Sequence, residues 1–66
     1  MIELRVREVR ERRGLSQEAL ARAAGTTQSA IARLEARRTV ERLHVPQLER
    51  IAKALGVGLK ELLHVE

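Results

Sequence analysis

The stretch SQEALARAAGTTQSAIARLE, residues 16–35, decides the fold because it holds the start and stop signals of two successive helices. Ser16 has a hydroxyl suited to N-cap a helix over residues 17–24, and Gly25 can adopt the left-handed conformation that ends it. Thr27 can then cap a second helix that begins at Gln28. The sequence therefore predicts two helices joined by a turn of about three residues, with glycine at the head of the turn.

The second of these helices, over about residues 28–37, has an unusual outward face. Two helices joined by a turn of three to four residues form the helix-turn-helix unit, whose second helix enters the major groove of DNA. At 100° per residue Ile31 and Leu34 point inward, and an outward arc of about 140° contains Gln28, Ser29, Ala32, Arg33 and Ala36. This arc carries no acidic side chain, so we expect that it can approach base edges closely.

Length and composition exclude several other roles. The 66 residues, 44% of them hydrophobic, make a single domain over residues 1–66. The sequence contains no Cys, Phe, Tyr, Trp or Asp, and its imidazoles are His44 and His64. A Ser-His-Asp triad cannot be assembled, and a zinc site would need both histidines plus glutamates at unrelated spacings. We therefore expect no catalytic residues, no metal site, no cofactor and no enzymatic activity.

The charge is distributed unevenly along the chain. The net charge of +4 lies wholly in residues 1–42, which carry ten basic and six acidic side chains. This asymmetry indicates a polyanionic partner, although the solvated surface of an arginine-rich protein would also show it. No apolar run approaches the ~18–20 residues of a membrane span. The N-terminus also lacks the uninterrupted apolar segment of a signal peptide, because charged residues alternate with its apolar ones. We expect no membrane contact and a cytoplasmic location.

The flanking segments predict an all-α fold with five helices in total. A first helix covers about residues 5–13, a fourth runs from about 45 or 46 to 55, and a last short helix covers about 59–63. Gly14 and Gly56 supply the C-terminal stops. One alternative stays open at the ends of the chain. Apolar residues there alternate with charged ones at the period of a strand, so the two termini could pair.

Arg10 is a charged residue on the core side of the first predicted helix. It lies only about 40° from Val6 on the helical wheel, so its guanidinium either finds a partner elsewhere in the fold or extends to solvent. Glu35 is the obvious counter-ion. It is the acid of the helix over residues 28–37, and it lies near Ile31 and away from the outward arc.

These residues together carry a resemblance to a known family. The ordered set consists of Arg10, GLSQ at 14–17, Leu20-Ala21, GTTQ at 25–28, Ile31, Leu34-Glu35 and IAKALGV at 51–57. With these residues in this order, the chain resembles the Cro/repressor-type (XRE-like) helix-turn-helix domains of phage repressors and bacterial regulators. The resemblance covers nearly its whole length. The resemblance implies a compact five-helix bundle of the lambda-repressor-like type and a sequence-specific transcription regulator that binds double-stranded DNA.

The resemblance also implies a role for individual residues. Gln17 and Thr27 match phosphate contacts at helix N-termini, where free N–H groups favour an anion. Base contacts are implied for Gln28, Ser29, Ala32 and Arg33, with Ala32 limited to van der Waals contact. Arg10 and Glu35 match a structural ion pair. A plainer alternative remains for each contact, since Gln17 and Ser29 could be ordinary surface residues.

Two departures from the family pattern concern the end of the recognition helix. Ala36-Arg37 stands where the family often has Asn-Gly, which favours a helix that runs on by a turn. The next connection is about two residues longer, and its charge suggests phosphate contacts by Arg37, Arg38 and Arg42.

The remaining expectations concern partners. We expect a homodimer on a two-fold operator. The best candidate for the dimer surface is the neutral C-terminal third, with Val57, Leu59, Leu63 and Val65, unless these residues only complete the core. The alternative is an antitoxin or adaptor whose main partner is another protein, such as a toxin.

Overall fold

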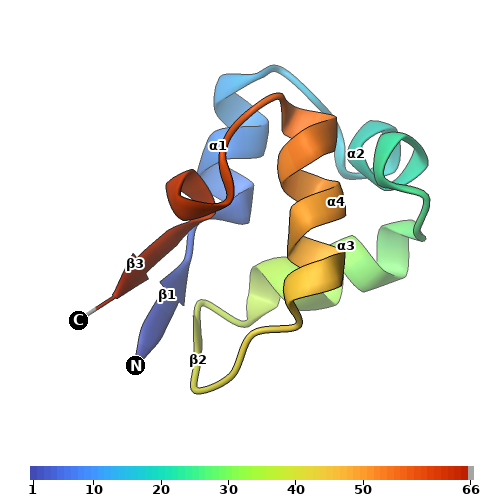
Figure 1. Cartoon of the computed structure of the whole chain (residues 1–66). Helices are drawn as coiled ribbons and strands as arrows, with labels where there is room; N and C mark the ends of the chain where they lie inside the picture. The colour runs from blue at the N-terminus through green and yellow to red at the C-terminus, as the bar shows by residue number, and fades with distance from the viewer. Residues whose placement is uncertain (66) are drawn as a thin grey trace.

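The computed structural model describes residues 1–65, which form four α-helices, a 3-10 helix and three short strands (Figure 1). In chain order these elements are β1 (Ile2–Leu4), α1 (Val6–Arg12), α2 (Gln17–Ala24), α3 (Gln28–Ala36), β2 (Thr39–Val40), α4 (Val45–Leu55), η1 (Leu59–Leu62) and β3 (Leu63–Val65). Within residues 1–65 no helix is long and apolar enough to cross a membrane.

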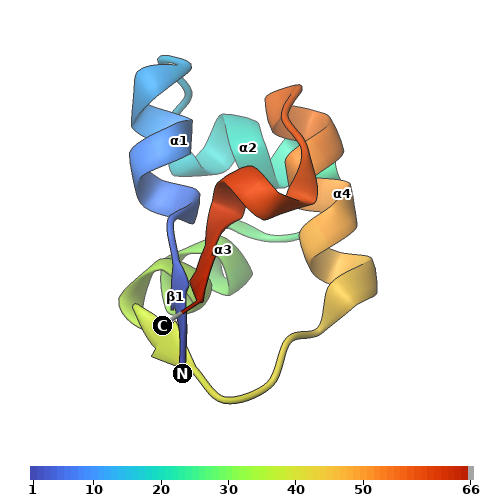
Figure 2. The same ribbon diagram turned by 60° about the vertical axis from the view of Figure 1, so that its left-hand side comes forward.

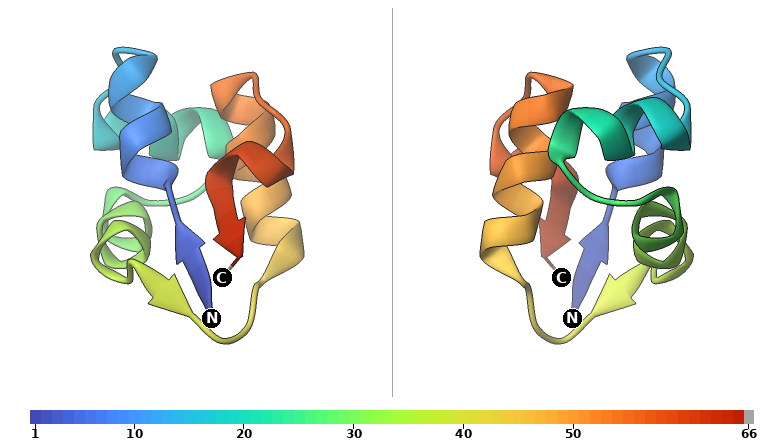
Figure 3. Two further views of the ribbon diagram at one scale, coloured as in Figure 1. Left: turned by 90° about the vertical axis from the view of Figure 1, so that its left-hand side faces the viewer. Right: turned by 90° about the vertical axis from the view of Figure 1, so that its right-hand side faces the viewer.

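The fold is mostly helical, as expected, but it departs from an all-α bundle of five helices in two respects. The fifth segment is a 3-10 helix of four residues, because Leu63 turns to an extended conformation and starts a strand. The described residues also form an antiparallel sheet in the order β2-β1-β3, with Ile2 paired to Val40 on one side and to Val65 on the other. The two termini therefore do pair and lie side by side, as Figure 2 and the left view of Figure 3 show.

The helix-turn-helix segment forms as its capping residues predict. Ser16 Oγ accepts a hydrogen bond of 3.0 Å from the Ala19 N–H, and Thr27 Oγ1 accepts one of 3.1 Å from the Ala30 N–H. Gly25 ends α2 with a φ of 69°, a left-handed conformation that side chains disfavour. The turn between α2 and α3 is thereby fixed at both ends by local hydrogen bonds and backbone conformation.

The expectation that α3 runs on by a turn is wrong. The helix ends at Ala36, and Arg37 leaves it with φ −91° and ψ 89°. The chain needs no left-handed residue here because it exits in an extended direction. The Leu4 N–H then donates to the Arg38 carbonyl at 2.7 Å, and Thr39 pairs with Glu3. Pairing with β1 thus satisfies the backbone that a further helical turn would have satisfied.

The core lies where the four α-helices and η1 meet. Its most deeply buried side chains come one from each of these elements: Val6, Leu20, Ile31, Ile51 and Leu62. Helix α2 packs against both α3 and α4, and the right view of Figure 3 shows α2 above α3. Because Ile31 faces this core, the opposite side of α3 faces outward.

Candidate nucleic-acid interface

The outward side of α3 is an open surface made of the residues that the helical wheel predicts. Gln28, Ser29 and Arg33 are exposed, Ala32 is half-buried between them, and Ile31 on the opposite side is fully buried. The helix has no acidic residue in its first turn. The surface therefore offers two long hydrogen-bonding side chains and a hydroxyl on a ridge without negative charge.

Arg10 and Glu35 form a buried ion pair that joins α1 to α3. Arg10 Nε donates to Glu35 Oε2 at 2.6 Å and Arg10 Nη2 donates to Glu35 Oε1 at 3.1 Å. Their side chains are 11% and 5% exposed. Arg10 Nη1 also donates to the Leu15 carbonyl at 2.7 Å, so the guanidinium does not extend to solvent. The pair holds the C-terminal half of α3 against α1.

The ionisation of Glu35 is set by competing effects. Burial would raise the pKa of its carboxyl, but hydrogen bonds from Arg10 and Gln17 and the charge of Arg10 outweigh burial. The pKa of Glu35 therefore lies below its usual value. The hydrogen bond to Glu35 correspondingly raises the pKa of Arg10. Both groups are charged at neutral pH.

Gln17 connects this ion pair to the start of the recognition helix. Its Nε2 donates to Glu35 Oε1 at 3.0 Å, and its Oε1 lies 3.5 Å from Gln28 Nε2. The sequence reasoning missed this link. A signal was present, because on a helical wheel Gln17 lies within about 60° of Leu20, Ala21 and Ala24, the buried side of α2. A polar residue on that side needs an internal partner.

The basic residues that follow α3 differ in whether a carboxylate of the protein already pairs with them. Arg37, Arg38 and Arg42 are all exposed. Arg38 Nη2 lies 3.3 Å from Glu8 Oε1, whereas among residues 1–65 no carboxylate lies within ion-pair distance of Arg37 or Arg42. Thr27 uses its hydroxyl oxygen as a cap acceptor, which leaves its O–H free to donate.

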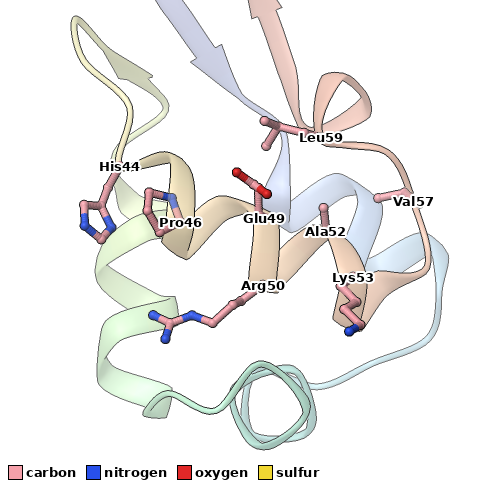
Figure 4. A pocket seen from close by; sticks show the side chains of 8 residues that line it. All are labelled: His44, Pro46, Glu49, Arg50, Ala52, Lys53, Val57 and Leu59. Carbon is pink, nitrogen blue, oxygen red and sulfur yellow. The ribbon is translucent and has the colours of Figure 1, made fainter.

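A wide groove lies on another side of the molecule, between α4 and η1 (Figure 4). Its volume is about 1050 Å³, and its apolar lining is Pro46, Ala52, Val57 and Leu59. In Figure 4 Glu49 points toward Leu59, while Arg50 and Lys53, which also line the groove, point away from Leu59. Two of the four residues expected at a dimer surface, Val57 and Leu59, line this groove, and Val65 is 69% exposed at the edge of the sheet.

In the described part of the chain no three His, Cys, Asp or Glu side chains are grouped closely enough to hold a metal ion. A family model described as helix-turn-helix matches residues 6–62. The match runs from α1 to η1 and leaves β1 and β3 outside. No curated protein matches the chain significantly.

Proposed function

Because the chain belongs to the Cro/repressor-type helix-turn-helix family, which is a DNA-binding family, we propose that it is a sequence-specific transcription regulator of double-stranded DNA. In this proposal α3 lies in the major groove. The observation that carries it is the exposed, acid-free face of Gln28, Ser29 and Arg33 on a helix anchored from behind by Ile31 and by the Arg10–Glu35 ion pair.

The side chains of this face suit base recognition in different ways. Gln28 can bond the N6 and N7 edge of adenine, and Arg33 can bond O6 and N7 of guanine with two parallel hydrogen bonds. Ser29 accepts several bases, and Ala32 offers a methyl group for contact with thymine. The link from Glu35 through Gln17 to Gln28 supports this assignment, because it restricts the Gln28 amide before DNA arrives.

Phosphate contacts would fix the register of α3 in the groove. We assign them to Gln17 and Thr27 at the N-termini of α2 and α3, and to Arg37, Arg38 and Arg42 after α3. The Gln17 amide is engaged by Glu35 and Gln28, so its contact is best made by the free backbone N–H groups at the start of α2.

We also propose that the protein is a homodimer, with the α4–η1 groove as the contact surface. A two-fold dimer binds half-sites about 10–10.5 bp apart. The groove supports this proposal because Pro46, Ala52, Val57 and Leu59 give it an apolar lining beside charged side chains of α4. The helix beside it carries Glu49 and Lys53 one turn apart, and an antiparallel contact between two α4 helices would place each Glu49 near the partner's Lys53.

Selection of bound sites from random duplex DNA tests the proposed function. We expect a palindromic site, and we expect Arg33→Ala to lose preference at one base pair per half-site, a discrimination of about 1–3 kcal/mol. The matched control is Arg42→Ala, which removes an equal charge. It should weaken all sequences alike and reduce the slope of log affinity against log salt by about 0.9. Unchanged selectivity in Arg33→Ala would contradict the role given to Arg33.

The same groove is the observation that favours the second candidate, an antitoxin or adaptor whose main partner is another protein. Sedimentation equilibrium separates the two. A dimer that Val57→Glu converts to a monomer supports the homodimer, whereas a monomeric wild type that binds duplexes without sequence preference supports the protein partner.

A further inference from the structure

The side chain of Arg38 is held by an acidic residue of a distant helix. Arg38 Nη2 lies 3.3 Å from Glu8 Oε1. Arg38 directly precedes β2, and Glu8 lies 30 residues earlier in the sequence, in α1. The Arg38 backbone is fixed separately, because its carbonyl accepts the Leu4 N–H at 2.7 Å. The side chain can therefore change partner without any movement of the sheet.

The contact between the two residues is weak enough to be exchanged. The side chains are 70% and 40% exposed, and the pair is a single hydrogen bond rather than a two-pronged one. Pairs of this kind change an equilibrium by no more than about fivefold. The other oxygen of Glu8, Oε2, is buried and has no hydrogen-bond partner within residues 1–65. Burial without a partner is unfavourable for a carboxylate oxygen, so the contact of Oε1 with Arg38 is the interaction that favours this position of the carboxylate.

We propose that Glu8 competes with the DNA backbone for Arg38 and thereby lowers the affinity of the protein for every duplex. This inference rests on the proposed DNA-binding function. Glu8 and a phosphate are both anions and repel each other at the same guanidinium, so Arg38 exchanges one for the other and the free energy of the ion pair is subtracted from the phosphate contact. Among the residues that the structure describes, Arg37 and Arg42 have no carboxylate within ion-pair distance and carry no such restraint. Base recognition by α3 is not involved, because neither Glu8 nor Arg38 lies on its outward face.

The chain offers a close control for the test. Glu11 lies one turn from Glu8 on α1 and pairs with Arg7 at 3.7 Å, in a contact that does not include Arg38. Glu8→Gln and Glu11→Gln therefore remove the same charge from the same helix, and only the first releases Arg38. Any gain in affinity that comes from net charge alone is common to both variants.

Fluorescence anisotropy with a labelled duplex of arbitrary sequence, titrated at several salt concentrations, measures the effect. We expect Glu8→Gln to bind about two- to fivefold more tightly than Glu11→Gln, with a salt slope steeper by at most about 0.9. In an Arg38→Ala background the difference between the two glutamine variants should vanish. Far-UV circular dichroism checks folding, and Glu8→Ala provides a second variant if Glu8→Gln is destabilised.

Three outcomes overturn the inference. Equal affinities of Glu8→Gln and Glu11→Gln would show that Glu8 does not restrain Arg38, and a gain that persists in Arg38→Ala would show that Glu8 acts on another group. In both cases the proposed function stands, because DNA is still bound. Failure of the wild type to bind any duplex at low salt would overturn the inference and the proposed function together.

Discussion

Removal of the Glu35 carboxylate is the most direct test of how α3 is positioned. Glu35→Ala leaves the Arg10 guanidinium nearly buried without its counter-ion, and it also removes the acceptor of Gln17 Nε2. Loss of one partner of a buried pair costs about 3–5 kcal/mol. A domain of this length has a total unfolding free energy of roughly 3–10 kcal/mol. We therefore expect Glu35→Ala to lose a large share of the stability and to melt at least 12 °C or so below the wild type.

Urea unfolding followed by far-UV circular dichroism measures this loss, since the chain has no aromatic residue to report by fluorescence. The control variant is Glu11→Ala, which breaks the exposed Arg7–Glu11 pair and should cost less than about 0.5 kcal/mol beyond any change in helix propensity. Replacing both members of the buried pair, as Arg10→Met with Glu35→Leu, should recover most of the stability, because no unpaired charge is then left inside.

A loss below about 1 kcal/mol in Glu35→Ala, equal to that of an exposed pair, would refute the reasoning. It would mean that Arg10 reaches water once its partner is gone, and that the ion pair does not fix α3. If the double variant Arg10→Met with Glu35→Leu were less stable than Glu35→Ala, the unpaired Arg10 guanidinium would not be the main cause of the lost stability.

Three further predictions concern pH and the helix ends. The pKa of Glu35 is lower in the folded than in the unfolded protein, so the stabilising contribution of its carboxylate is complete above about pH 4.5 and is lost as the pH falls through the folded pKa. The difference in unfolding free energy between wild type and Glu35→Gln, measured by urea titration, should therefore shrink as the pH falls over that range. Thr27→Val, which removes the cap of α3, should cost about 1 kcal/mol of unfolding free energy by the same method, and a cost near zero would argue against the cap. Gly25→Ala should cost about 1–2 kcal/mol, measured by thermal melting, from backbone conformation alone, since an added Cβ at this position would touch no neighbouring atom.

The helix-turn-helix segment was predictable because its signals are local. Ser16, Thr27 and Gly25 act within one turn of the helices that they begin or end, and the wheel of α3 depends on its own sequence. The same local reasoning placed Arg10 on the core side of α1 and named Glu35 as its counter-ion, and the resemblance to the family then implied the pair. The position of Gln17 on the buried side of α2 could have been predicted in the same way.

The pairing of the two termini was open from the sequence, because apolar and charged residues alternate there, but strand β2 and the contacts at its edge could not be predicted. Thr39 and Val40 form a strand of two residues, which is too short for any periodic pattern, and their partners Glu3 and Ile2 lie far away in sequence. The exit of α3 was misjudged for the same reason, since β1 provides the alternative to another helical turn. The Arg38–Glu8 contact joins two surface residues that come close only because β2 pairs with β1, next to the start of α1.

The order of the strands has a consequence for the folding pathway. The central strand β1 comes first in the chain, while both of its neighbours follow much later, so each pairing closes a long loop. The helix-turn-helix unit needs only contacts between near neighbours and can form early, whereas the sheet must assemble last. In the native state the sheet should also open first, which would expose the Leu4 amide to hydrogen exchange long before that of Leu20.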